Sequence, residues 1–232
     1  MLKGISMAAK AMKNQTARHD MIANNLANVN TTGFKKDIAV FQQMDTLQGE
    51  KDTLVRVAVS YEQGPVTRTD RPLDLAIQGE GFFVVDTDAG ERYTRAGAFM
   101  VDSDGFLVTL DGDLLSGGIS VPPGNIDITR EGLVRVDGAT MGEVRVVTFD
   151  EISRLEKAGS GLLKAPEDLS PTDLGAEDKI VLSGFLESSN VEVVTEMTEM
   201  ITALKAYEIS QKALKSEDEI LKLLTGTVGR IG

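Results

Sequence analysis

The chain has 232 residues, of which 41% are hydrophobic and 26% charged, so it is long enough to bury a core. Its net charge is −12 without any lysine- or arginine-rich run, which argues against binding to nucleic acid or to anionic membranes. The absence of cysteine excludes disulfides, thiolate zinc sites and thiol nucleophiles.

Residues 3–28 are predicted to form one helix that is rich in Ala, Met and Lys and free of proline. Its charged residues interrupt any apolar run, so we expect no cleaved signal peptide, and no later run reaches the about 20 residues of a membrane span. Because an isolated helix of this kind is marginal in water, we expect it to be ordered only when packed. Positions three and four residues apart form a stripe: Ile5, Ala8, Met12, Gln15, His19, Ile22, Leu26 and Val29.

A polar segment follows this helix. Asparagines and Gly33 in residues 24–34 favour left-handed backbone and local hydrogen bonds, which end helices. Residues 35–61 have weak periodicity and are predicted to be a connector. Val55, Val57 and Val59 alternate with smaller or polar residues, which indicates one short strand in it.

From about residue 63 the apolar period becomes two, and glycines recur between short runs. This pattern predicts an antiparallel β domain, and residues 167–179 are predicted to be a surface loop. No helical pattern alternates with the strands, so a parallel α/β fold is disfavoured. The predicted strands are 73–78, 82–86, 92–95, 98–101, 106–109, 126–129, 133–136, 144–149 and 180–186.

Three motifs suggest chemistry but favour plainer interpretations. Residues 102–105 (DSDG) resemble the start of a calcium loop, yet Leu107 and Asp113 stand where such a loop needs Gly and Glu, so a turn is favoured. Residues 79–81 (GEG) precede a strand instead of opening a helix, which favours a tight bend over a dinucleotide site. His19, the only histidine, is more often a packed or interface residue than a metal or catalytic one in such a context.

The last long element is a predicted helix over residues 190–224. Its stripe has the same spacing as that of the first helix, so the two stripes are expected to pack against each other, against neighbouring copies, or both. A plain intramolecular helical hairpin is the simpler alternative, because periodicity does not identify the partner. The stripe consists of Met197, Met200, Leu204, Tyr207, Gln211, Leu214, Asp218 and Leu221.

Several segments resemble the axial proteins of the bacterial flagellum, the rod and hook proteins. They are residues 24–35 (NNLANVNTTGFK), 73–85 (LDLAIQGEGFFVV), 93–99 (YTRAGAF), 189–191 (SNV) and 200–208 (MITALKAYE). The resemblance covers residues 1–44, 63–117 and 183–232 in the expected order.

The resemblance implies an α+β fold in which the N- and C-terminal helices form a coiled-coil layer around which a central, mainly antiparallel β domain lies. We divide the chain into an N-terminal coiled-coil helix with its Asn-rich turn (1–35), a connector (36–62), a central β domain (63–187) and a C-terminal coiled-coil helix (188–232). The residues expected at the assembly interface are Ile5, Met12, Ile22, Leu26, Asn28, Gly33, Phe34, Met197, Met200, Leu204, Tyr207, Leu214 and Leu221.

The implied function is that of a non-enzymatic structural subunit of the basal-body rod in the periplasm, which self-assembles with other rod proteins. The flagellar export apparatus would deliver it without signal cleavage, and no cofactor, nucleic acid or small-molecule substrate is expected. The small size and the short stretch 45–62 favour the proximal over the distal rod protein. A soluble coiled-coil adaptor that forms a closed dimer is the alternative from another class, and an enzyme is less favoured because no acid–base or metal constellation is present.

Overall fold

In the computed structural model the chain forms two compact units, described over residues 2–45, 51–175 and 177–228. The helical unit contains the chain up to Ala27, residues 37–58 and the chain from Glu192 onward. The β unit contains residues 28–36 and 59–191. Terminal helices and a central antiparallel β region confirm the α+β class that the sequence predicts.

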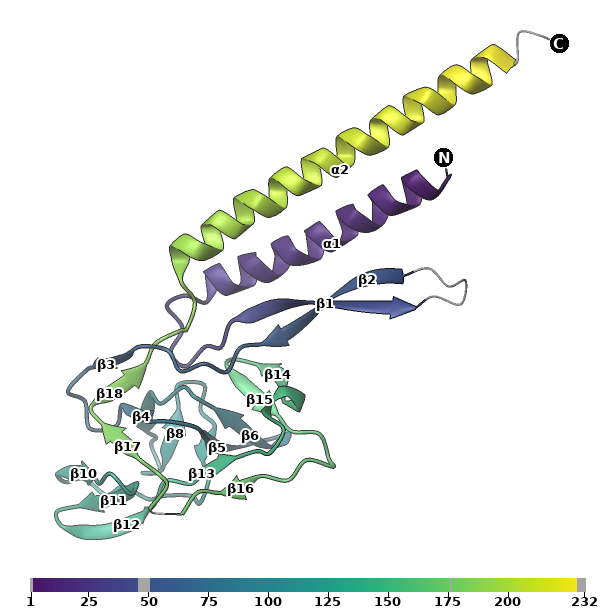
Figure 1. The fold of residues 1–232 in the computed structure, drawn as a ribbon. Helices are drawn as coiled ribbons and strands as arrows, with labels where there is room; N and C mark the ends of the chain where they lie inside the picture. The colour runs from purple at the N-terminus through teal and green to yellow at the C-terminus, as the bar shows by residue number, and fades with distance from the viewer. Residues whose placement is uncertain (1, 46–50, 176, 229–232) are drawn as a thin grey trace. The chain divides into compact units, whose positions relative to one another are not determined.

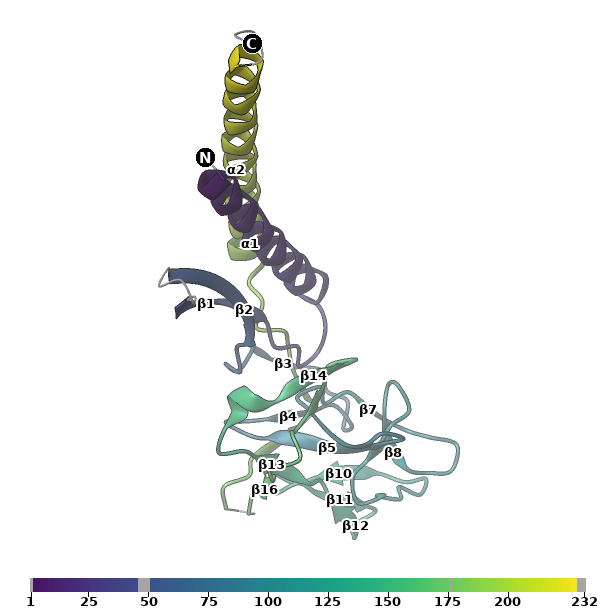
Figure 2. The same ribbon diagram turned by 90° about the vertical axis from the view of Figure 1, so that its right-hand side faces the viewer.

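The helical unit consists of two helices and a hairpin (Figures 1 and 2). Helices α1 (Leu2–Ala27) and α2 (Val193–Val228) lie side by side and antiparallel. Strands β1 (Asp37–Asp45) and β2 (Lys51–Val59) pair with each other. In the described part of the chain, neither helix is apolar over enough of its length to span a bilayer.

The hairpin corrects a sequence prediction. We expected a polar connector with one short strand, whereas most of this stretch belongs to two nine-residue strands. Weak periodicity fails to predict such strands because a hairpin is stabilised by cross-strand pairing, which depends on residues outside each run.

The β unit is built around one large antiparallel sheet. Its main strand order is β14-β15-β6-β5-β9-β8-β7, with β13 paired to β5 and β16, and β10-β11-β12 form a separate sheet. Two further pairs, β17 with β4 and β18 with β3, join the end of the unit to its beginning. The elements are β3 (Val66–Arg68), β4 (Leu75–Ile77), β5 (Phe82–Thr87), β6 (Gly90–Thr94), β7 (Phe99–Val101), β8 (Leu107–Thr109), β9 (Leu114–Leu115), β10 (Ile126–Ile128), β11 (Leu133–Val136), β12 (Ala139–Glu143), β13 (Val146–Thr148), the 3-10 turn η1 (Ile152–Arg154), β14 (Glu156–Gly159), β15 (Leu162–Lys164), β16 (Thr172–Asp173), β17 (Val181–Ser183) and β18 (Phe185–Glu187).

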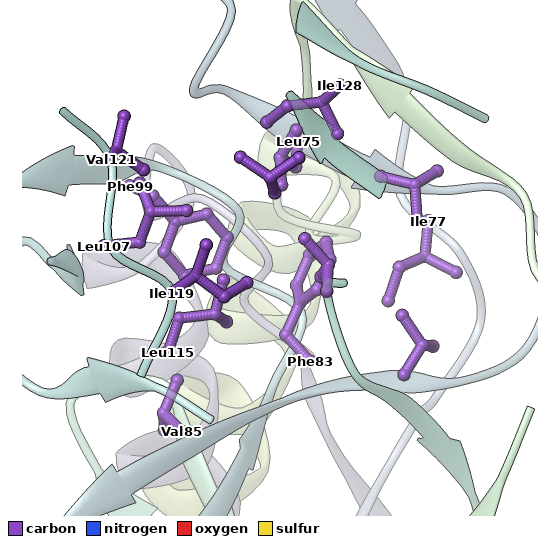
Figure 3. Packing of buried hydrophobic residues seen from close by; sticks show 14 of the residues in the cluster. Leu75, Ile77, Phe83, Val85, Phe99, Leu107, Leu115, Ile119, Val121 and Ile128 are labelled. Carbon is purple, nitrogen blue, oxygen red and sulfur yellow. The ribbon is translucent and has the colours of Figure 1, made fainter. Parts of the chain in front are cut away.

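Alternation along β5 gives the β unit two apolar cores, one on each face of the sheet. Phe83 and Val85 point into the larger core, which Figure 3 shows with Phe99 among its members. Phe82 and Val84 point into the smaller core on the opposite face. Successive residues of one strand therefore supply both cores, which fixes the register of β5 against slippage.

The predicted strands are present, with ends displaced by a few residues, but β3, β9, β12, β14, β15 and β16 were not predicted. The stretch 167–179, expected to be a surface loop, contains β16, which pairs with β13. One of the predicted strands, residues 180–186, is two strands, β17 and β18, because Gly184 between them has a φ of +79°. That left-handed backbone interrupts an extended run and suits glycine. Gly79 (φ +94°) and Gly81 (φ +128°) form the predicted bend between β4 and β5.

Candidate functional site

The predicted stripe on α1 faces the interior of the helical unit. Ile22 is buried, and Ile5, Met12 and Leu26 are half-buried. Ile22 packs with Met21 of α1 and Ala203 of α2 in a small apolar core, to which Met200 and Ala39 also contribute. The interior of this unit thus combines residues from both helices and from β1.

The predicted stripe on α2 only partly coincides with the face that packs inside the unit. Met200, Tyr207 and Leu214 are half-buried, whereas Met197 and Leu204 are exposed. The side chain of Leu221 lies outside the described residues. The positions that turn inward also lie four and three residues apart, but every second one lies one residue earlier than in the predicted stripe. They are Glu196, Met200, Ala203, Tyr207, Ser210, Leu214 and Glu217.

Helix α2 carries a second apolar row, which we call the outer stripe: Val194, Met197, Ile201 and Leu204. These side chains are 72%, 52%, 54% and 46% exposed. Their spacing of three, four and three residues places them along one side of the helix. A continuous apolar row of this kind, half open to solvent, is typical of a surface that binds another protein.

Asn25 holds the helices to the start of the hairpin. Its side-chain amide donates to the Asp37 carbonyl (2.8 Å) and to Glu196 Oε2 (3.2 Å), and its Oδ1 accepts from the Asp37 backbone N–H (2.8 Å). Arg18 adds an ion pair to Glu199 at 3.1 Å. Because Asn25 is fully buried, these bonds fix the end of α1 to the start of β1.

A groove of about 260 Å³ lies between the two helices within this unit. His19 lines it, with its Nδ1 3.9 Å from Asp20 Oδ1. No group of three or more metal-ligating side chains occurs in the part of the chain that the structure describes. The lining residues are Gln15, Thr16, His19, Ala203, Leu204 and Tyr207.

The Asn-rich turn ends in a tightly packed glycine within the β unit. Gly33 has a φ of +66°, and its N–H donates to the Glu187 carbonyl at 2.7 Å. A Cβ at Gly33 would lie 2.3 Å from the backbone nitrogen of Ala96, which leaves no room for a side chain. Asn28, half-buried, accepts a hydrogen bond from the Thr31 backbone at 3.1 Å. Phe34 is buried, with the Lys157 ammonium 4.4 Å from its ring centre.

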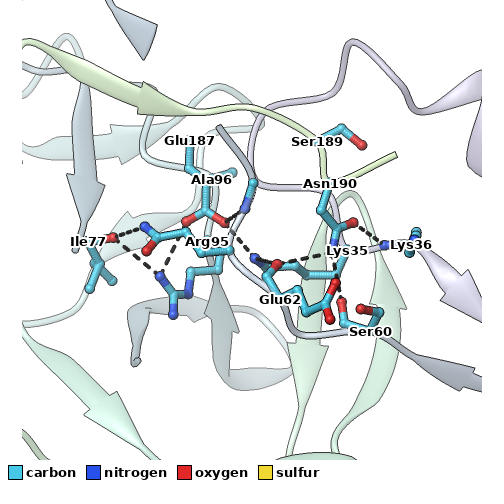
Figure 4. Close-up of polar contacts among 12 residues, drawn as sticks. Lys35, Lys36, Ser60, Glu62, Ile77, Arg95, Ala96, Glu187, Ser189 and Asn190 are labelled. Carbon is cyan, nitrogen blue, oxygen red and sulfur yellow. Dashed lines mark hydrogen bonds and ion pairs between the residues drawn. The ribbon is translucent and has the colours of Figure 1, made fainter. Parts of the chain in front are cut away.

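Next to Gly33 lies a buried charge cluster, shown in Figure 4. The Glu187 carboxylate accepts hydrogen bonds from Lys35 (2.5 Å), from Arg95 (3.2 Å) and from the Gly64 backbone N–H (3.1 Å). Burial lowers the pKa of the Lys35 ammonium and of the Arg95 guanidinium, and Glu187 opposes both shifts. The single negative charge of Glu187 thus lies against two buried positive charges, so both Lys35 and Arg95 depend on it for charge compensation.

Asn190 completes the same cluster. Its Oδ1 accepts from the Lys36 backbone N–H (2.7 Å), and its amide donates to the carbonyls of Ser60 and Glu62, both at 3.0 Å. We call Lys35, Arg95, Glu187 and Asn190 the polar junction. It joins three segments that are far apart in the sequence.

Lys35, Arg95 and Asn190 lie in segments that carry the family resemblance, but the sequence did not predict that they meet at Glu187. A signal was present in Glu187, which follows the apolar residues Phe185 and Leu186 at the end of a predicted strand. A charged residue at a position that should face a core indicates a buried ion pair. Which cations it meets depends on the fold, because Lys35 and Arg95 lie 152 and 92 positions away.

Three family models match segments of the chain, and several known proteins are similar to it over most of its length. Residues 5–35 match the family model described as flagella basal body rod protein, residues 76–136 the flagellar hook protein FlgE/F/G D1 domain, and residues 182–226 the flagellar basal body rod FlgEFG protein C-terminal. The chain is 35% identical to the flagellar basal-body rod protein FlgG of Caulobacter vibrioides, covering 95% of this chain and 97% of that protein. It is 34% identical to FlgG of Bacillus subtilis, covering 97% and 98% of the two chains. It is also 35% identical to the flagellar basal-body rod protein FlgF of C. vibrioides, covering 91% and 92%.

Proposed function

Because the chain belongs to the family of flagellar basal-body rod proteins, we propose that it is a structural subunit of the rod, assembled with other axial proteins of the basal body. Its role is mechanical and not catalytic. Its partners are copies of itself and other rod proteins, and neither nucleic acid nor a small-molecule substrate takes part.

The outer stripe is the observation that carries this proposal. Its four large side chains are about half exposed, so their burial in an assembly would contribute on the order of 3–6 kcal/mol per subunit. That gain repeats with every copy, which suits a continuous shaft. The predicted interface residues Met197 and Leu204 belong to this stripe, and Ile22, Met200 and Leu214 support it from the inner face of the helices.

We further propose that α1 and α2 contribute to a coiled-coil layer in the assembled rod. The 4-3 spacing of the inward positions of α2 supports this, since it is the repeat that coiled coils use. The remaining predicted interface residues, Asn28, Gly33 and Phe34, belong to the β unit, where they hold the turn that follows α1.

The lengths of the alignments bear on the position in the rod. The alignment with C. vibrioides FlgG runs over 255 positions, more than the 232 residues of this chain, so that relative has segments without a counterpart here. The alignment with FlgF runs over 227 positions. Because small size favours the proximal rod protein, the match to the shorter relative supports a proximal position over a distal one.

The location follows from the same proposal. A rod subunit works in the periplasm, where we expect the chain to arrive through the flagellar export apparatus with its N-terminus uncleaved.

Replacing Leu204 by Asp tests the proposal. The buried charge should abolish incorporation into purified basal bodies, while the β unit stays folded, because Leu204 lies in the other unit. Ser216→Asp is the matched control, with the same charge change at an exposed position of α2. Leu26→Asp should behave like Leu204→Asp. Normal incorporation of Leu204→Asp would refute the role of the outer stripe.

The adaptor alternative is distinguished by the state of the purified protein. An adaptor would form a closed dimer that covers the outer stripe in solution, with the helices protected from hydrogen exchange. A rod subunit is expected to be a monomer whose α2 exchanges faster than its β unit, because the stripe lacks its partner.

A further inference from the structure

One half of the large sheet has a face whose residues belong to neither apolar core. Cross-strand partners Asp86–Leu114, Leu114–Val108 and Val108–Met100 form one row across β5, β9, β8 and β7. Directly paired residues point to the same face of a sheet, so these four side chains line one surface about 14 Å long, at about 4.8 Å per strand.

The opposite face of the same strands is buried, as Figure 3 shows for Phe99, Leu107 and Leu115. On the row's own face, the smaller core draws on β5, β6, β13 and β15 and includes no residue of β7, β8 or β9. Met100 is 43% and Leu114 38% exposed, and Leu110 in the adjoining turn is 68% exposed, whereas Val108 between Met100 and Leu114 is only 4% exposed. We call Met100, Val108, Leu110 and Leu114 the sheet patch.

Carboxylates frame the sheet patch on one side. Asp86 and Asp88 belong to the β5–β6 hairpin, and Asp111 and Asp113 belong to the turn between β8 and β9. The pairing of Asp86 with Leu114 brings this hairpin and this turn close together. Within the described part of the chain, none of these four carboxylates is in an ion pair. They do not form a metal site either, since no cluster of ligands occurs among the described residues.

The charge of the whole chain is concentrated in the β unit. This unit contains 24 acidic and 13 basic residues, whereas the helical unit contains 12 acidic and 11 basic ones. Two sheet patches brought face to face would therefore place uncompensated carboxylates against each other, which disfavours contact between copies through this surface.

We propose that the sheet patch is a docking surface for a different polypeptide, one that presents an apolar centre framed by lysine or arginine side chains. The inference rests on the proposed function, because a patch of this size gives a weak contact by itself. In an assembly the contact repeats on successive subunits, so weak individual contacts suffice.

The test uses the photo-crosslinking amino acid p-benzoyl-phenylalanine at position 114, and separately at position 100, in cells of the source bacterium. Basal bodies are purified after irradiation, and crosslinked peptides are identified by mass spectrometry. We expect adducts from both positions to a different polypeptide, at a site where basic residues flank apolar ones.

Charge reversal provides the second arm. Asp111→Lys combined with Asp113→Lys should reduce the adduct at position 114 by about tenfold, because two favourable rim contacts become repulsive. Glu167→Lys combined with Glu177→Lys makes the same charge change at exposed positions outside the patch and should leave the adduct unchanged.

Three results would each overturn the proposal: adducts to another copy of this chain, no adduct at either position, and an adduct that the charge reversal does not reduce. These results leave the rod assignment intact as long as the chain is present in the purified basal bodies. Absence of the unsubstituted chain from basal bodies would instead refute the proposed function itself.

Discussion

Replacing Glu187 by Gln tests the polar junction most directly. The substitution keeps the shape of the side chain and removes its charge. Lys35 and Arg95, both almost fully buried, would then share a site without a carboxylate. Gln can accept only part of the three hydrogen bonds that Glu187 now accepts from Lys35, Arg95 and Gly64.

The expected loss is large relative to the stability of a domain. Removing one partner of a buried ion pair costs about 3–5 kcal/mol, because the remaining charge is left without compensation. Domains of this size have a free energy of unfolding of about 5–15 kcal/mol. We therefore expect the melting temperature of the β unit to fall by about 10 °C or more.

Tyrosine near-ultraviolet circular dichroism during thermal and urea unfolding of the full chain measures this loss. Tyr61 and Tyr93 both pack in the smaller core of the β unit, and all variants carry Tyr207→Phe, so that the tyrosine signal reports on that unit. Glu62→Gln is the control, because it removes the same charge from an exposed side chain and should cost less than about 0.5 kcal/mol. If Glu187→Gln costs no more than this control, the reasoning about the junction is wrong.

Three further substitutions test other contacts. Gly33→Ala should destabilise the β unit by at least about 2 kcal/mol in urea unfolding, because alanine would adopt left-handed backbone there and its Cβ would clash with the backbone of Ala96. Gly79 also has left-handed backbone but open space around it, so Gly79→Ala should cost only about 1 kcal/mol. Asn25→Ala should raise hydrogen exchange throughout the helical unit, at a cost of about 2–4 kcal/mol, since it leaves buried partners unpaired; unchanged exchange would contradict that role. The pKa of Lys35 is lowered in the folded state, so between the folded-state pKa and 10.5 the unfolded chain binds one more proton than the folded chain. The free energy of unfolding of the wild type, relative to that of Lys35→Met, should therefore rise with pH in that window. Urea unfolding at several pH values measures it, and a decrease with pH would refute the direction.

The sequence alone determined the class of the fold. The change of apolar period from three and four to two separates the helices from the strands, and the glycines locate turns such as the bend at Gly79 and Gly81. These are local properties, because a residue's backbone preference and the side to which it points depend on its near neighbours. The stripe on α1 is a local property in the same sense, and its members Ile5, Met12, Ile22 and Leu26 are buried or half-buried.

Only the tertiary structure decided which face of α2 turns inward. The inward row and the predicted stripe share Met200, Tyr207 and Leu214, and they differ in whether Ala203 or Leu204 faces α1. Leu204 is the more apolar, so the sequence favours it, but small Ala203 lets the helices pack closely around Ile22. The larger side chain lies at the edge of the groove between the helices and is 46% exposed, where we propose that another subunit contacts it.

The polar junction was also beyond local reasoning. Glu187 meets Lys35 and Arg95 only because β18 returns beside β3 and the chain after α1 packs against the same place. A buried charge is stable only where its partners converge from distant parts of the chain, and spacing along a sequence does not encode that convergence.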